Sequence, residues 1–238
     1  MNILIVNDDG YTSEGLKILQ RALKKYGNVY VVAPHVEQSA KSASITIREG
    51  LKVHSHEDQV YSVEGTPSDC IKVAIHALNI EIDLVCSGIN RGYNLGFDTI
   101  YSGTVGAGME ALINGIPTIA LSSDLDEFKN AEKELVQTLE FIFKHNLLSQ
   151  HYLLNVNFQA KEFEDAKGIL ITDLGTRDFK ISFEEKEGKY YSSREFYKLN
   201  DTNLTDFKAV HDGYISITPL KLGNGDHTLV ELLNEKIK

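Results

Sequence analysis

The segment Ile3-Leu4-Ile5-Val6-Asn7-Asp8-Asp9-Gly10 decides the fold class of this chain. Its first four residues are all apolar, which is typical of a strand buried on both faces, as in a parallel sheet. Gly10 favours a turn, so Asp8 and Asp9 stand where the strand ends. Parallel sheets bind ligands at the carboxyl ends of their strands. The two adjacent acids therefore mark a candidate site at that edge.

Asp8 and Asp9 also suggest what the site binds. Neighbouring carboxylates repel one another, and each raises the pKa of the other unless a cation neutralises them. Oxygen-rich sites favour hard divalent ions, so the pair predicts a metal site. Taken alone, the pair has a simpler interpretation, in which the acids cap the next helix and form a turn with Gly10. The metal prediction therefore depends on further oxygen ligands from other strands.

The whole chain has the composition of an ordinary soluble enzyme. It contains 238 residues and carries a formal net charge of -10. This acidic balance argues against polymeric nucleic acid as a partner, because there is no basic stripe to displace counterions from phosphates. Cys70 and Cys86 lack C-x-x-C spacing, so neither a zinc ribbon nor a disulfide scaffold is predicted. With no basic leader and no apolar run of ~18 residues, we expect a cytoplasmic protein without a membrane partner.

From Met1 to about Ser123 the chain alternates apolar strands with helical patterns. This alternation indicates βαβ units and a mostly parallel α/β sheet, and we expect residues 1–160 to form the catalytic core. The expected strands cover residues 3–6, 29–33, 60–63, 84–87, 118–122 and 153–158, and His54 and His56 alternate on a further one. The expected helices carry the stripe Leu16, Leu19 and Leu23, the N-cap Thr66 with a helix through Ala77, the N-cap Thr104 with a helix to Gly115, and the stripe Leu135, Leu139, Ile142 and Phe143.

The remaining residues, 161–238, have a different pattern and are expected to form a C-terminal extension packed on the core. Residues 179–183, a turn near Glu187-Gly188 and residues 190–197 predict an extended β-hairpin. Because a two-stranded hairpin is marginally stable alone, it must pack on the core or on another subunit. The extension is completed by a strand at 214–218 and by a terminal helix with the stripe Leu229, Leu232, Leu233 and Ile237.

Two further loops leave the same edge of the predicted sheet and carry oxygen-bearing side chains. The polar loop at 38–44 contains Ser39, which offers a hydroxyl oxygen. The glycine-rich loop at 87–96 lets the backbone approach a ligand closely, and its Asn90 supplies a neutral oxygen. Two carboxylates, one amide and one hydroxyl would leave Mg²⁺ or Mn²⁺ with open positions for water and substrate. The convergence of these loops favours the metal site.

The segment 101–108 runs small residues directly into a helix. Unpaired N–H groups at a helix start bind phosphate, and the hydroxyls of Ser102 and Thr104 can complete such a cradle. The segment matches neither G-x-G-x-x-G nor the P-loop, and its glycines are equally explained by close packing of a helix on the sheet. Beside an oxygen-only metal site, phosphate binding is the favoured interpretation.

Other residues carry weaker predictions. The histidines include no H-E-x-x-H pair, and only His35 lies beside the predicted site. Ser42 and Ser44 lack a histidine and an acid partner, so a serine-hydrolase triad is not predicted. Lys41 and Arg91 lie near the edge, where they would either hold an anion or remain solvated.

Five motifs in order resemble the survival protein E (SurE) nucleotidase family. The resemblance extends from the first strand to near residue 220 and is least anchored between residues 163 and 207. The motifs are Val6-Asn7-Asp8-Asp9-Gly10, Gly65-Thr66-Pro67-Ser68-Asp69-Cys70, Ser87-Gly88-Ile89-Asn90-Arg91-Gly92, Tyr101-Ser102-Gly103-Thr104-Val105-Gly106 and Gly213-Tyr214-Ile215-Ser216-Ile217-Thr218-Pro219-Leu220.

The resemblance implies a Rossmann-like core and a metal-dependent 5′-nucleotidase, with some relatives also cutting 3′-nucleotides or short polyphosphate. It implies homodimers or homotetramers built by exchanged C-terminal segments. It also implies one divalent cation per subunit, Mg²⁺ or Mn²⁺, on Asp8, Asp9, Ser39 and Asn90. We expect Asp8, Asp9 and Asn90 to be catalytic, with Asp8 as base, nucleophile or ligand. For the substrate phosphate we expect Ser102, Gly103, Thr104 and, in addition, Asn94.

The sequence departs from the family pattern at three positions. Ala40 and Ala111 stand where glycine is usual, and Gln159 stands where proline is frequent. If residue 40 must adopt a positive φ, alanine would strain or shift the loop that carries Ser39. None of these changes removes a proposed ligand oxygen.

Two alternatives come from other functional classes. A phosphoaccepting receiver module would need an aspartate after the third strand and a lysine after the last, where this chain has Glu64-Gly65-Thr66 and Ser122-Ser123. A regulator without catalysis would bind nucleotide and metal but release no phosphate. A phosphate-release assay distinguishes this regulator from a phosphatase.

Overall fold

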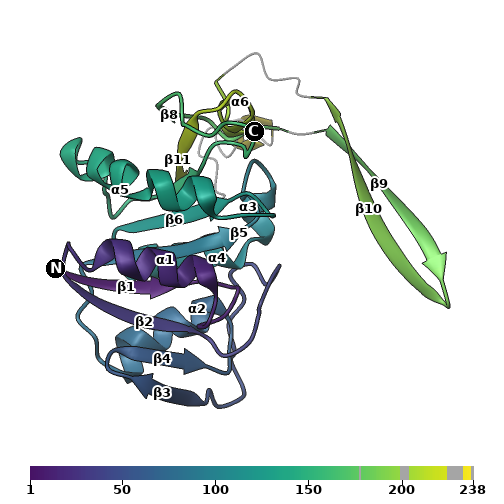
Figure 1. Ribbon diagram of the computed structural model, residues 1–238. Coiled ribbons are helices and arrows are strands. Elements are labelled where there is room, and N and C mark those ends of the chain that lie inside the picture. The colour runs from purple at the N-terminus through teal and green to yellow at the C-terminus, as the bar shows by residue number, and fades with distance from the viewer. Residues whose placement is uncertain (177, 199–203, 224–232, 237–238) are drawn as a thin grey trace.

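The computed structural model of the chain describes residues 1–176, 178–198, 204–223 and 233–236. A nine-stranded sheet in the order β3-β4-β2-β1-β5-β6-β7-β11-β8 runs through the molecule (Figure 1). All neighbouring strands are parallel except the pairs β3–β4 and β7–β11, which confirms the predicted mostly parallel sheet. Its strands are β1 (Asn2–Val6), β2 (Asn28–Pro34), β3 (Val53–Glu57), β4 (Val60–Val63), β5 (Leu84–Arg91), β6 (Thr118–Ser123), β7 (Tyr152–Asn157), β8 (Ile169–Ile171) and β11 (Ile215–Lys221).

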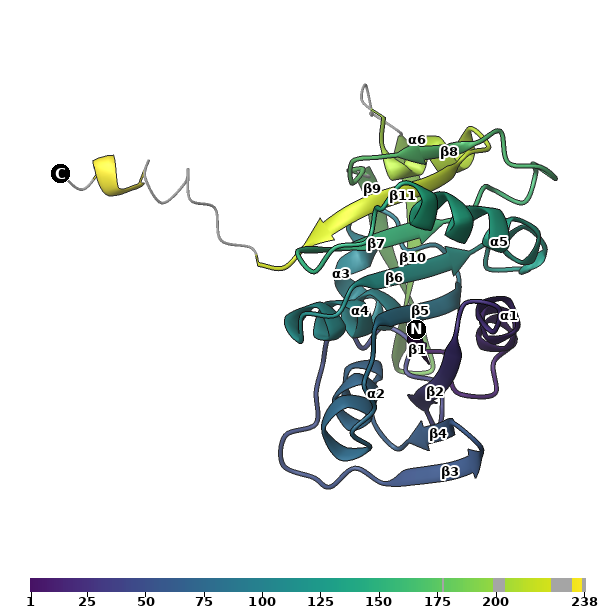
Figure 2. The same cartoon turned by 90° about the vertical axis from the view of Figure 1, so that its left-hand side faces the viewer.

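Helices cover both faces of this sheet (Figure 2). Ile3 and Ile5 of β1 pack under α1 and α5, whereas Leu4 and Val6 point to the opposite face under α2 and α4. All four side chains are fully buried, which contributes about 1.5–3 kcal/mol each. The helices are α1 (Glu14–Leu23), α2 (Pro67–Lys72) with the π-helical turn η1 (Val73–Ala77), α3 (Asp98–Tyr101), α4 (Gly103–Ile113), α5 (Lys129–Lys144) and α6 (Asp206–His211).

Of the two helix caps that the sequence predicts, the structure confirms Thr66 and contradicts Thr104. Thr66 caps α2 and accepts from the backbone N–H of Asp69, whose carboxylate accepts in turn from the N–H of Thr66, as the sequence predicts. At α4 the cap is Ser102, which accepts from the N–H of Val105 at 3.1 Å. Thr104 is therefore not the cap, because its hydroxyl is directed at the end of β1.

The C-terminal extension contributes both to the sheet and to a separate hairpin. Strands β8 and β11 continue the main sheet beyond β7. The predicted hairpin is present as β9 (Asp178–Lys186) and β10 (Lys189–Lys198), joined at Glu187-Gly188, and it projects from the body of the molecule (Figure 1). Residues 233–236 are helical. The rest of the predicted terminal helix, with Leu229, Leu232 and Ile237, lies outside the described residues.

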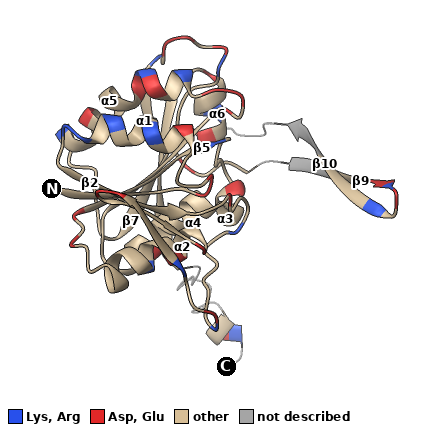
Figure 3. Cartoon of the chain, turned by 60° about the horizontal axis from the view of Figure 1, so that its bottom comes forward, with Lys and Arg blue, Asp and Glu red and all other residues tan. Residues whose placement is uncertain are grey.

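The surface mixes charges of both signs. Figure 3 shows basic and acidic residues interspersed along α1 and α5. Arg21 of α1 pairs with Glu132 of α5 at 2.7 Å, and Lys25, just after α1, pairs with Glu140 of α5 at 3.0 Å. Exposed pairs of this kind contribute little stability. Within the described ranges, no helix is both long and apolar enough to cross a membrane.

Candidate active site

The turn after β1 is held by a buried asparagine. The side-chain amide of Asn7 donates to the carbonyl of Gly10 at 3.0 Å and to the hydroxyl of Ser13 at 2.7 Å. Ser13 in turn caps α1 by accepting from the N–H of Leu16. Gly10 adopts a φ of 98°, which favours glycine. The strand, the turn and the next helix therefore fix the backbone of the two acids.

Asp8 is buried against the N-terminus of α4. The hydroxyl of Thr104 donates to Oδ1 of Asp8 at 2.5 Å. A Cβ atom at Gly103 would lie 2.9 Å from both Cβ and Oδ2 of Asp8, so only glycine fits there. The hydroxyl of Ser87 on β5 donates to the carbonyl of Thr104 at 2.7 Å and secures this helix end. The predicted phosphate-binding segment and the first predicted metal ligand are thus in direct contact.

The two acids form an electrostatically unfavourable pair. Burial raises the pKa of Asp8, although the hydrogen bond from Thr104 opposes the shift. Burial and then the charge of Asp8 raise the pKa of Asp9 to about 6, against a smaller lowering by its hydrogen bond from the Arg91 backbone. That N–H lies 3.3 Å from Oδ2 of Asp9. A cation between these carboxylates would reverse both shifts.

Asn90 comes from the end of β5. This strand continues to Arg91, so Asn90 belongs to the strand and pairs with Ser122 of β6 instead of lying in a loop. Its amide nitrogen donates to the carbonyl of Gly92 at 2.8 Å, which leaves the amide oxygen as the acceptor end of the side chain. The residue therefore presents a neutral oxygen ligand from a well-fixed backbone.

Ser39 lies on the exposed loop that follows β2. Its hydroxyl donates to Oε1 of Glu37 at 2.6 Å. The next residue, Ala40, has a φ of 58°, so alanine occupies the left-handed conformation in which glycine would be unstrained. Further along, Ser42 fastens the loop to α3, with its hydroxyl donating to the carbonyl of Ile100 at 2.6 Å.

These segments surround one cavity of about 270 Å³. The cavity brings together Asp8, Ser39 and Asn90, while Asp9 adjoins it through the backbone of Arg91. Of the predicted phosphate residues, Ser102 and Asn94 line the cavity, and Gly103 and Thr104 pack behind it on Asp8. The lining consists of Asp8, Ser39, Ala40, Asn90, Arg91, Gly92, Tyr93, Asn94, Asp98, Tyr101 and Ser102.

Asn94 is held by residues that the sequence reasoning missed. Its backbone N–H donates to Oδ1 of Asn157 at 2.9 Å, and its side-chain nitrogen donates to the hydroxyl of Ser122 at 2.8 Å. The side chains of Asn155 and Asn157 both donate to its carbonyl. The sequence signal for this contact was the pair of asparagines, Asn155 and Asn157, within the buried strand β7. Buried amides need hydrogen-bond partners, so the pair indicates a polar contact there.

The donor set fits a hard divalent cation. Among the described residues, no group of three or more His, Cys, Asp and Glu is arranged to hold a metal. The residues around the cavity instead offer two carboxylates, an amide oxygen and a hydroxyl, which suit Mg²⁺ or Mn²⁺ better than zinc. The raised pKa values of both acids show that this position favours added positive charge.

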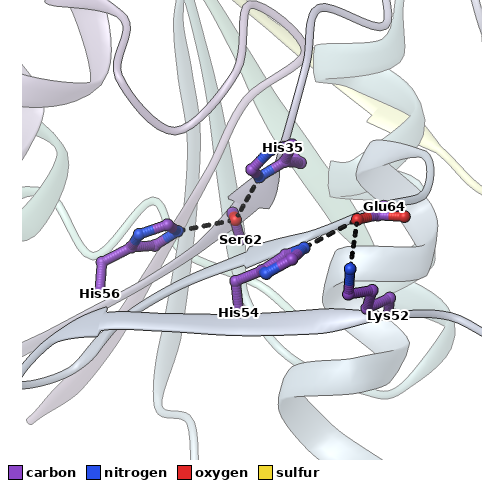
Figure 4. A network of polar contacts seen from close by, with 6 residues as sticks. All are labelled: His35, Lys52, His54, His56, Ser62 and Glu64. Atoms are coloured by element: carbon purple, nitrogen blue, oxygen red, sulfur yellow. Dashed lines mark hydrogen bonds and ion pairs between the residues drawn. The ribbon is translucent and has the colours of Figure 1, made fainter.

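His35, beside the predicted site, belongs to a separate cluster (Figure 4). Its Nδ1 lies 2.9 Å from the hydroxyl of Ser62, which also lies 2.8 Å from Nε2 of His56. His54 pairs with Glu64 at 2.8 Å. The three histidines thus contact Ser62 and Glu64, at or just after β4. None of them lines the cavity.

Comparison with known proteins identifies similar chains over almost the full length. The family model of survival protein SurE matches residues 3–181. Proteins named 5′-nucleotidase SurE from Mannheimia succiniciproducens and Haemophilus influenzae are 37% and 36% identical; the matches cover 99% and 98% of this chain and 98% and 97% of theirs. The crystal structure of a SurE protein from Aquifex aeolicus has a TM-score of 0.88 and 34% identity, with all of both chains covered.

Proposed function

The chain belongs to the survival protein SurE family, and from this premise we propose that it is a metal-dependent phosphatase of nucleoside 5′-monophosphates. It is an enzyme, a phosphoric monoester hydrolase with nucleotidase activity. One observation carries the proposal. Asp8 at the end of β1 contacts the N-terminus of α4 through Gly103 and Thr104, beside a cavity that Asn90 and Ser39 also line. An acid that prefers a cation and a helix start that prefers an anion therefore adjoin one space.

The cation would be held by Asp8, Asp9, Ser39 and Asn90, one per subunit. Its chemistry is Lewis-acid stabilisation of the negative charge that develops on phosphoryl oxygens. Ser39 can keep its hydrogen bond to Glu37, because its hydroxyl donates the hydrogen and retains the oxygen lone pairs that a cation would bind. The family resemblance supports Mg²⁺ or Mn²⁺.

The chain's own residues position the phosphate. The hydroxyl of Ser102 lines the cavity at the N-terminus of α4, and the helix dipole adds positive potential there. Because the transition state spreads charge over the equatorial oxygens, this hydroxyl and the dipole would stabilise it more than the ground state. Asn94 borders the same cavity, with its amide nitrogen already held by Ser122.

Asp8 stands where a base or a nucleophile is needed. The hydrogen bond from Thr104 to Oδ1 fixes its orientation and leaves Oδ2 against Gly103. Burial favours its protonated form in the absence of a cation, so the ionised form needed for either role depends on charge compensation at this edge. This coupling makes activity dependent on the metal through Asp8 itself.

A phosphate-release assay tests the proposal. We expect release from nucleoside 5′-monophosphates, and also from 3′-monophosphates and short polyphosphate, to stop with a chelator and return when Mg²⁺ or Mn²⁺ is added. Asp8→Asn should keep the fold and abolish turnover, while Asp165→Asn, at an exposed acid paired with Lys133, should retain it. Binding of nucleotide and metal without any phosphate release would instead establish the regulator. Retained activity of Asp8→Asn would exclude Asp8 as essential.

The same family resemblance supports a subunit organisation. We take residues 1–160 as the catalytic core and 161–238 as an extension exchanged within a homodimer or homotetramer. Ile181, Phe183, Tyr190 and Tyr191 are exposed on the projecting hairpin, and such apolar exposure is typical of an interface. Light scattering should give a dimer or tetramer for the wild type and a smaller species for Ile181→Ser with Phe183→Ser.

A further inference from the structure

Asp206 is a fully buried carboxylate at the first residue of α6, far in sequence from the candidate site. Its Oδ1 accepts from the backbone N–H groups of Gly175 and Phe207, each at 2.8 Å. Its Oδ2 accepts from the N–H of Gly96 at 2.7 Å. Charge-assisted hydrogen bonds of this kind are about twice as strong as neutral ones. Asp206 therefore ties the C-terminal extension to the segment between β5 and α3.

The extension closes tightly over Gly96. A Cβ atom at this position would lie 2.4 Å from the carbonyl oxygen of Gly175 and 2.7 Å from a ring carbon of Phe207. Gly96 also has a φ of 51°, a conformation that disfavours other residues. The C-terminal extension therefore fixes the position of the Gly96 backbone.

Gly96 lies in the turn that leads into α3, the helix that forms one wall of the cavity. Its carbonyl accepts from both the N–H of Thr99 at 3.3 Å and the hydroxyl of Thr99 at 2.7 Å, which joins this turn to α3. Asp98 and Tyr101 of this helix line the cavity, and Tyr101 is exposed at its edge. A hydrogen-bonded path therefore leads from Asp206 to the wall beside the phosphate cradle.

The residues at the ends of β1 and β5 are fixed independently of α3. Asp8 is held by Thr104, and Asn90 is held by its pairing with β6. Neither contact involves α6. The loop that carries Ser39 is instead fastened to α3, because the backbone N–H and the hydroxyl of Ser42 donate to the carbonyls of Tyr101 and Ile100. A change at Asp206 should consequently displace the α3 wall and leave Asp8 and Asn90 in place.

We infer that Asp206 is a positioning residue that fixes the α3 wall, with Asp98 and Tyr101, against the nucleoside part of the substrate. The inference rests on the proposed function for the identity of the substrate. Since β9 and β10 lie between Gly175 and Asp206 in the chain, the same carboxylate also secures the foot of the projecting hairpin. The extension thereby takes part in shaping the substrate site.

Asp206→Asn in the full-length enzyme tests this role, because asparagine keeps the shape but replaces one acceptor oxygen with a donor. Loss of one such hydrogen bond predicts a KM for nucleotide raised about three- to tenfold, with kcat within about twofold of wild type. Hydrogen exchange should become faster for the amides of residues 95–101. Gly96→Ala, which strains the same contact from the loop side, should give the same pattern.

Thr205→Ala is the matched control. Thr205 caps α6 by accepting from the N–H of Lys208, so its loss weakens the same helix without touching Gly96. We expect lower thermal stability with unchanged KM and unchanged exchange at 95–101. The inference is overturned if Asp206→Asn and Gly96→Ala both keep wild-type KM and exchange, or if Thr205→Ala reproduces their effects. If the wild type releases no phosphate, the proposed function fails, whereas the exchange comparison still decides whether Asp206 holds the loop.

Discussion

Gly103→Ala should disable the candidate site through a single added methyl group. The new Cβ would lie 2.9 Å from both Cβ and Oδ2 of Asp8 and 3.2 Å from Cγ of Pro67. Carbon atoms prefer separations of about 3.5–4.0 Å, so Asp8 or the start of α4 must move by roughly 0.5–1 Å. Overpacking of this kind lowers the free energy of unfolding by about 1–3 kcal/mol. A 1 Å displacement of a reacting group lowers kcat/KM by about a hundredfold.

Gly108→Ala provides the matched control on the same helix. Its Cβ would lie 3.1 Å from a methyl group of Thr118 and 3.3 Å from a methyl group of Leu153, both at the ends of side chains that can adjust. Alanine is also the better helix former by about 1 kcal/mol. We therefore expect its stability within about 1 kcal/mol of wild type and an unchanged kcat/KM.

Phosphate release and urea unfolding, measured on both variants and the wild type, decide this prediction. The expected result is a loss of activity in Gly103→Ala that far exceeds its loss of stability, with neither loss in Gly108→Ala. A Gly103→Ala enzyme with activity within twofold of wild type would refute the contact between α4 and Asp8 as a functional one.

Three further changes test other contacts in the site. Because burial raises the pKa of Asp9 to about 6, its ionised form destabilises the metal-free protein above pH 6, and this penalty disappears below about pH 4. With allowance for solvent screening, Asp9→Asn should therefore raise the free energy of unfolding by about 1–2 kcal/mol at pH 7.5 in chelator and have no effect at pH 4, as measured by thermal unfolding. Thr104→Val removes the hydrogen bond to Asp8 and should lower kcat/KM by roughly 10- to 100-fold, and wild-type kinetics would contradict this role. Ala40→Gly relieves the strain of a positive φ, but glycine also increases the entropy of the unfolded chain. Because these two effects oppose one another, the free energy of unfolding in urea should change by less than about 1 kcal/mol. A large loss of stability would show that Ala40 is unstrained.

Hydrophobic periodicity was sufficient to predict most of the sheet. The predicted strand at 60–63 has those bounds, β1 begins one residue earlier than predicted, and β2 extends one residue beyond its prediction at each end. The apolar run of β1 is unbroken because Ile3, Leu4, Ile5 and Val6 are buried on both faces of the sheet. The short elements β8, α3 and α6 were not predicted, because three to six residues carry too little periodicity.

Side-chain contacts across the site were harder to predict than its residues. The motif at 101–106 indicated a phosphate cradle with Thr104 as the cap of the following helix, whereas in the structure Ser102 caps α4 and Thr104 donates to Asp8. Asn90 was expected in a loop and lies in β5. Asp206 carried no local motif, because its partner Gly96 is 110 residues away and sequence spacing contains no information on such contacts.

Anomalous diffraction from crystals grown with Mn²⁺ and inorganic phosphate tests the central claim most directly, namely that one ion binds at the acidic end of β1 beside a helix that receives the phosphate. We predict a single manganese peak within bonding distance of Asp8, Asp9, Ser39 and Asn90, with the phosphate between this ion and the residues 102–104. A manganese peak bound elsewhere, with no ion at Asp8 under saturating conditions, would contradict the account.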